Sequence, residues 1–136
     1  MHNKLLFFCI TTAVICLGGT QKNLTGEFRK AHEFCQIRSD TRIEEDLMDR
    51  AAAGQTVDEY KLGNHLFCMY IKMGIMSRDG SIKAATLRQQ LVEPVKDEAV
   101  IDGILRNCVP SRVQHGTSQE VAAELFRCVR RNLRNA

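Results

Sequence analysis

The stretch TVDEYKLGNHLFCMYIKMG, residues 56–74, is the part of the sequence that decides the fold. Its apolar residues recur at spacings of three and four, which is typical of an amphipathic helix and not of a strand. Thr56 stands three residues before Glu59, the spacing of a capping box, and Gly74 offers a left-handed stop. We therefore predict a helix over residues 57–73.

The same signals recur on both sides of this stretch and predict an all-α fold. Thr41 with Glu44 and Thr117 with Glu120 repeat the capping-box spacing ahead of further periodic segments. Pro94 is expected to close the helix that precedes it. The predicted helices cover residues 24–37, 42–53, 57–73, 82–92, 98–108 and 118–133.

The beginning of the chain has the pattern of a secretory signal peptide. A basic start is followed by an apolar run over residues 5–17 and by the small residues Gly18 and Gly19. The run is too short for a stable membrane span, and the alternative is a buried N-terminal strand or helix. We expect residues 1–19 to be removed on export, leaving residues 20–136 as one helical domain in the extracellular space.

Export changes what the cysteines imply. The mature domain keeps four of the six cysteines: Cys35, Cys68, Cys108 and Cys128. In an oxidising compartment they predict two disulfides, with all three connectivities left open by spacing alone. A zinc site is the alternative, because His32 and His65 each stand three residues before a cysteine. Oxidised cysteines cannot act as thiolate ligands, so we expect disulfides and neither a metal nor another cofactor.

The charge balance argues against a nucleic-acid partner. The chain has 19 Lys and Arg against 16 Asp and Glu, a formal net charge of +3, which is too small and too mixed for binding to a phosphate backbone. The arginines near the C-terminus suit the negative end of a helix dipole instead. No segment after residue 19 approaches the apolar length of a membrane span, so we expect no membrane insertion.

The positions of the four cysteines and the segment CMYIKMGIMSRDG, residues 68–80, resemble the insect odorant-binding protein family of the pheromone and general odorant-binding type. Cysteines in place of Asn64 and Gln119 would complete the six-cysteine pattern of that family. Their joint absence is similar to the Minus-C subgroup, which has four mature cysteines. The resemblance implies two disulfides, Cys35–Cys68 and Cys108–Cys128.

The resemblance also implies a compact six-helix, disulfide-linked domain that encloses an apolar cavity. One implied bridge lies in each half of the chain, so no covalent link crosses between the halves. We therefore hypothesise a pocket that opens more easily than in six-cysteine relatives.

The function implied by the resemblance is a secreted carrier. Such a protein binds small hydrophobic ligands (odorants, pheromones or similar semiochemicals) and transports them in an aqueous extracellular fluid. Tyr60, Tyr70 and His115 are candidates to orient a ligand, although each is expected at the surface. The residues expected to line the cavity are Leu66, Met69, Met73, Met76, Leu87, Leu91, Ile104, Leu105, Leu125 and Phe126.

Several further expectations accompany the carrier function. Asn23 begins an N-glycosylation sequon, with occupancy left open. Chemoreceptors and a weak homodimer are left open as further partners. Titration of His32, His65 or His115 is a hypothesis for loosening of the fold in mild acid.

Two other functions are compatible with a small exported helical domain. One is an interaction protein, such as a venom or immune component, on the same fold. The other is a small lipid hydrolase, which is less favoured. Leu66 follows His65 where a phospholipase would need a calcium-binding Asp, and no Gly-rich calcium loop precedes it. We therefore do not expect an enzyme.

Overall fold

The computed structural model describes residues 26–110 and 116–136, so the predicted signal peptide, the Asn23 sequon and His115 lie outside the described residues. Within these ranges the chain forms six helices and no β-strand, which confirms the all-α prediction. The helices are α2 (Gly26–Ile37), α3 (Leu47–Ala52), α4 (Glu59–Lys72), α5 (Ala84–Val95), α6 (Glu98–Cys108) and α7 (Ser118–Arg134).

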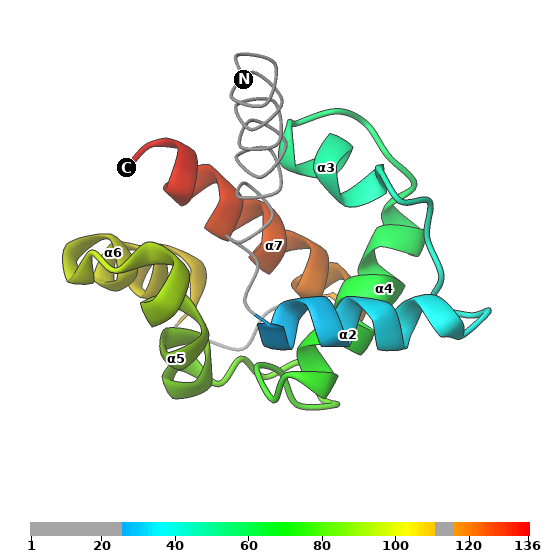
Figure 1. The fold of residues 1–136 in the computed structure, drawn as a ribbon, viewed down its shortest axis with the longest axis horizontal. Helices are drawn as coiled ribbons and strands as arrows, with labels where there is room; N and C mark the ends of the chain where they lie inside the picture. Colours follow the sequence, from blue (N-terminus) through cyan, green and yellow to red (C-terminus); the bar gives the residue numbers. More distant parts are fainter. Residues whose placement is uncertain (1–25, 111–115) are drawn as a thin grey trace, which may run out of the picture.

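The helices α4 and α7 form the centre of the domain. The helix α7 packs along α4 and also contacts α3 and α6, while α2 lies on α4 and α5 packs on α6 (Figure 1). Leu62, Leu66 and Met69 of α4 are fully buried, and they anchor one contiguous apolar core. No helix in the described ranges has the length and apolar character needed to cross a membrane.

Two disulfides join neighbouring helices. Cys35–Cys68 links α2 to α4, and Cys108–Cys128 links α6 to α7. These are the two pairs that the resemblance implies, and each stays within one half of the chain. The ties between the halves that the described residues show are non-covalent, such as Arg127 of α7, which donates to both carboxylate oxygens of Glu59 of α4 at 2.6 and 2.5 Å. Easier opening of the pocket stays a prediction.

The helices α4 and α7 come very close at Gly63. A Cβ atom built on Gly63 would stand 2.8 Å from the carbonyl oxygen of Gln119 and 3.1 Å from its Cβ. Only glycine fits there without a movement of the helices. Asn64 and Gln119, where the six-cysteine pattern would have its further pair, lie at this approach.

The substitution Gly63→Ala is expected to lower the free energy of unfolding by about 1–3 kcal/mol, because the new methyl group would push α4 away from α7. Gly103→Ala in α6 is the matched control, since the nearest atom to its Cβ would be 3.9 Å away. There the better helix propensity of alanine should raise stability by up to about 1 kcal/mol. Urea unfolding of both variants measures the difference, and a stabilised Gly63→Ala variant would contradict the close packing.

The helix starts follow the sequence signals in part. Thr117 caps α7 in a full capping box: its hydroxyl accepts from the Glu120 N–H at 3.1 Å, and the Glu120 carboxylate accepts from the Thr117 N–H at 2.8 Å. The predicted box at Thr56 is wrong, because α4 begins at Glu59 and its N-cap is Asp58, whose carboxylate accepts from the Lys61 N–H at 3.1 Å.

The predicted helix over residues 42–53 is shorter than expected. The helix α3 covers only Leu47–Ala52, and the capping box expected at Thr41 does not form. The Thr41 hydroxyl instead donates to the carbonyl oxygen of Cys35 at 2.7 Å. The side-chain oxygen of Gln36 accepts from the Ile43 N–H at 2.8 Å, and its amide nitrogen donates to the Ile43 carbonyl oxygen at 3.0 Å. The segment after α2 therefore satisfies the free carbonyls at the end of that helix and is not helical itself.

The prediction that Pro94 ends its helix is also wrong. The helix α5 passes through Pro94 to Val95, and Lys96 closes it in a left-handed conformation with φ of 63°. Because Pro94 lies in the last turn, its missing N–H removes one hydrogen bond near the helix end and leaves the earlier turns intact. The expected left-handed stop is confirmed at Gly74, with φ of 73°, and Gly54 after α3 has the same conformation, with φ of 83°.

Candidate ligand-binding cavity

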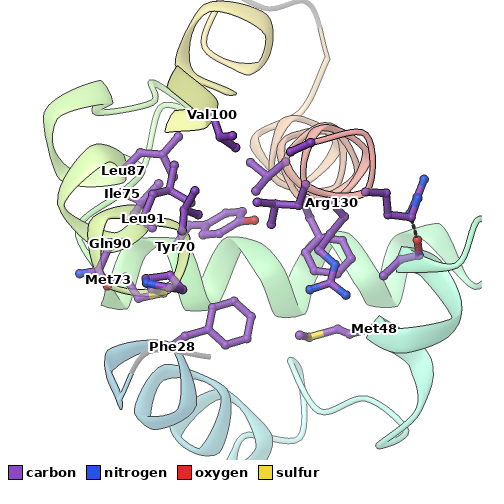
Figure 2. Close-up of a pocket in the computed structure, with 18 of the residues that line it drawn as sticks. Phe28, Met48, Tyr70, Met73, Ile75, Leu87, Gln90, Leu91, Val100 and Arg130 are labelled. Atoms are coloured by element: carbon purple, nitrogen blue, oxygen red, sulfur yellow. Dashed lines mark hydrogen bonds between the residues drawn. The ribbon is translucent and has the colours of Figure 1, made fainter. Parts of the chain in front are cut away.

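A cavity of about 630 Å³ lies among the helices, and all six described helices contribute to its wall (Figure 2). This volume falls in the range of small-molecule binding sites, about 300–1,000 Å³. The lining residues are Phe28, Met48, Asp49, Ala52, Tyr70, Met73, Ile75, Leu87, Gln90, Leu91, Pro94, Val95, Asp97, Val100, Phe126, Val129, Arg130, Leu133, Arg134 and Ala136.

The apolar wall is built from the inner faces of amphipathic helices. On α7, Phe126, Val129 and Leu133 follow one another at spacings of three and four, which places them on one face. Leu87 and Leu91 do the same on α5 and are 4% and 7% exposed. These two faces meet across the cavity, so the space between them is bounded mainly by hydrocarbon.

Four of the ten residues predicted to line the cavity do so: Met73, Leu87, Leu91 and Phe126. The other six are not in its wall: Leu66, Met69, Met76, Ile104, Leu105 and Leu125. Five of these are buried in the core, and Leu105 packs partly buried against it. The apolar stripe of α4 meets α7 directly, so its middle fills the core and only its C-terminal end reaches the cavity. Contact of any of the ten with a ligand stays a prediction.

The helices α2 and α3 and the end of α7 also contribute to the cavity wall, which the sequence did not lead us to expect. Phe28 and Met48 close one side of the cavity (Figure 2). Val129 and Leu133 lie in turns whose arginines suggested a solvated helix end. Their spacing from Phe126 was the signal that could have placed them in the wall.

Tyr70 is buried, and its expected place at the surface is wrong. The side chain is 5% exposed and reaches from α4 across the cavity (Figure 2). Burial raises the pKa of the Tyr70 hydroxyl far above its usual range, so this group stays protonated. Tyr60 differs, being 78% exposed as expected.

Charged side chains are confined to the rim of the cavity. Asp49, Asp97, Arg130 and Arg134 line it but are exposed to solvent. Arg134 donates a hydrogen bond to the carbonyl oxygen of Ala52 and so ties the end of α7 to α3. The cavity thus combines an apolar interior with a polar edge, as binding sites for small apolar molecules do.

The two His-x-x-Cys units meet outside the cavity. Cys35 and Cys68 form a disulfide, and Nδ1 of His32 lies 2.9 Å from Nε2 of His65. The bond occupies both sulfur atoms that the zinc alternative would need. In the described part of the chain no group of three or more His, Cys, Asp or Glu is placed to hold a metal ion.

An all-α chain with helices joined by disulfides around an apolar cavity belongs to the class of small helical binding proteins. Residues 19–132 match the model of the PBP/GOBP family, and the chain belongs to this family. This confirms the resemblance to odorant-binding proteins.

Two curated relatives come from Tenebrio molitor. The chain is 27% identical to the "B1 protein" over 94 residues, which cover 69% of this chain and 70% of the relative. It is 24% identical to the "B2 protein" over 94 residues, which cover 69% and 71%. No solved structure matches the chain significantly.

Proposed function

We propose that the chain is a secreted carrier that binds small apolar molecules, of the odorant or pheromone type, and transports them in an aqueous extracellular fluid. The apolar cavity of about 630 Å³ is the observation that carries this proposal. An apolar molecule that moves from water into such a space gains about 25 cal/mol for each Å² of surface removed from water. Membership of the PBP/GOBP family supports the same function.

The two disulfides fit export, because such bonds persist in an oxidising fluid. The proposal includes removal of residues 1–19 as a signal peptide. The lipid-hydrolase alternative gains no support at His65, because its ring is fully buried and hydrogen-bonds the carbonyl oxygen of Thr41.

The substitution Val100→Trp is expected to weaken binding of a fluorescent apolar probe by at least about tenfold, because the indole ring would occupy part of the cavity. Val100 is half-buried in the cavity wall on α6. Val92→Trp on α5 is the matched control, since Val92 is 45% exposed and outside the wall. Probe titrations of the two variants and the wild type, all checked for helix content, measure the effect.

Each variant also gains its own reporter, because the natural chain has no tryptophan. Emission from a tryptophan at position 100 should respond to bound ligand, whereas emission from position 92 should not. Equal probe affinity for all three proteins would place the ligand elsewhere. A wild-type protein that binds no apolar probe would favour the interaction-protein alternative.

A further inference from the structure

The side-chain amide of Asn132 on α7 lies against the Cys108–Cys128 disulfide. Its nitrogen is 3.4 Å from Sγ of Cys108 and 3.6 Å from Sγ of Cys128, and it donates to the carbonyl oxygen of Cys128 at 2.8 Å. Its oxygen accepts from the side-chain amide of Asn107 at 2.8 Å. Because a backbone carbonyl can only accept a hydrogen bond, the nitrogen of the Asn132 amide is the atom that faces the two sulfurs.

A hydrogen-bond donor in this position acts unequally on the closed and the open bridge. The sulfur of a disulfide is neutral and accepts only weakly, whereas a thiolate is charged and accepts a strong hydrogen bond. The amide of Asn132 therefore stabilises the thiolate of the open bridge more than the sulfurs of the closed one. A disulfide is more readily reduced when its reduced form is stabilised in this way.

The other bridge lacks such a donor. Among residues 26–110 and 116–136 no side chain forms a hydrogen bond with a sulfur of Cys35–Cys68. Exposure does not separate the two bridges, because Cys68 is half-buried and Cys128 is 7% exposed. The Asn132 amide is thus the feature that distinguishes the chemistry of Cys108–Cys128 from that of Cys35–Cys68.

We propose that Cys108–Cys128 is a thiol-exchange site, which a small thiol of the glutathione type opens. The external thiolate attacks Sγ of Cys128 and forms a mixed disulfide, and the electron pair of the broken S–S bond stays on Sγ of Cys108. There the amide of Asn132 stabilises the new thiolate. A second thiol then attacks the external sulfur of the mixed disulfide, which frees Cys128 as a thiolate and leaves the two external thiols joined as a disulfide. Two electrons thus pass from the external thiols to the bridge.

The opened bridge would free two helices of the cavity wall. The helix α5 packs on α6, and Arg88 of α5 donates to Glu98 and Asp102 of α6, so the two helices form one unit (Figure 1). The bridge joins this unit to α7 at Cys108, the last residue of α6. Both helices line the cavity. The bridge stays closed in a thiol-poor extracellular fluid, and in thiol-rich surroundings its opening lets α5 and α6 move away from α7 and release the ligand. This consequence rests on the carrier function proposed above, whereas the exchange reaction does not.

Timed reduction of the folded protein by glutathione tests the exchange site. Alkylation of the freed thiols and peptide mapping by mass spectrometry follow the two bridges separately in one molecule. We expect Cys108–Cys128 to open about five- to tenfold faster than Cys35–Cys68 in the wild type. Asn132→Leu keeps a similar volume without the donor, and it should remove this difference by slowing Cys108–Cys128 alone. Asn135→Leu is the matched control, because Asn135 is exposed just after α7, and it should keep the wild-type rates.

The Cys35–Cys68 bridge also reports whether a variant is folded, because unfolding would speed the reduction of both bridges. If Asn132→Leu shows that pattern, Asn132→Asp decides, since it keeps the volume and the polarity but repels a thiolate and should slow Cys108–Cys128. Reduction of Cys35–Cys68 first in the wild type, or an unchanged rate at Cys108–Cys128 in the folded Asn132 variants, overturns the exchange site.

The double variant Cys108→Ser, Cys128→Ser mimics the open bridge and tests its effect on the cavity. We expect it to release a fluorescent apolar probe about tenfold faster than the oxidised wild type. Equal release rates overturn the link between the bridge and the cavity. An oxidised wild type that binds no probe overturns the carrier function, whereas the order of reduction of the two bridges still tests the exchange site.

Discussion

Replacing Cys35 and Cys68 together by alanine is expected to lower the free energy of unfolding by about 4 kcal/mol. The bridge spans a sequence separation of 33 residues, and opening it returns the entropy of that loop to the unfolded chain. The helix α2 contributes only Ala31 and Cys35 as buried residues, and its main neighbour is α4, so the bridge is its strongest tie. Its loosening should also weaken ligand binding, since α2 supplies Phe28 to the cavity wall.

The second bridge provides the comparison. Replacing Cys108 and Cys128 by alanine opens a loop of 20 residues, for which we expect a loss of about 3 kcal/mol. The helix α6 keeps more packing of its own, since Ile101 and Ile104 are fully buried. Urea unfolding followed by far-ultraviolet circular dichroism measures both losses. A loss below about 1 kcal/mol in the first variant would mean that packing alone holds α2.

The capping residues in the sequence predicted a helix start correctly where their side chains bond to the first turn of the same helix. Thr117 and Glu120 cap each other, and Asp97 caps α6 by accepting from the Ala99 N–H at 2.9 Å. Thr41 carries the same sequence signal but uses its hydroxyl on the carbonyl of Cys35, six residues earlier. The sequence pattern could not separate these cases, because the outcome at Thr41 depends on how the chain turns after α2.

The cavity was harder to predict than the helices. An apolar stripe has the same composition whether it meets another helix or borders an empty space, so Met69 and Met73 looked equivalent in the sequence. In the fold Met69 is fully buried in the core and Met73 borders the cavity. The place of Leu133 in the cavity wall was not predicted, because the arginines at the end of α7 indicated a solvated helix end. A helix end can be solvated on one face and line a cavity with the other.

The hydrogen bonds of His65, which is buried, and His32, which is half-buried, define where the protons of the two rings lie. The carbonyl oxygen of Thr41 can only accept a hydrogen bond, so Nδ1 of His65, at 2.7 Å from it, must carry a proton. In the neutral ring Nε2 is then an acceptor, and Nδ1 of His32 donates to it at 2.9 Å. A charged His65 ring would have to donate from both nitrogens, which reverses the direction of its hydrogen bond with His32.

Acidification to pH 4 is therefore expected to lower the free energy of unfolding by about 3 kcal/mol through His65. Burial of the ring, opposed in part by the hydrogen bond to Thr41, lowers the pKa of His65 from 6.5 to about 4. Between these two values the unfolded chain binds a proton that the folded chain does not. The contribution is complete above the unfolded pKa and is lost as the pH falls toward the folded pKa.

The variant His65→Asn isolates this contribution, because an amide nitrogen can still donate to Thr41 but does not titrate. We expect it to be less stable than the wild type at neutral pH, since the smaller side chain leaves a cavity. Its stability should then fall less steeply between pH 6.5 and 4, so that the two curves converge in acid. Urea unfolding at several pH values measures both curves. Parallel curves would show that other groups cause the acid sensitivity, because His65 is the titratable group that the variant lacks.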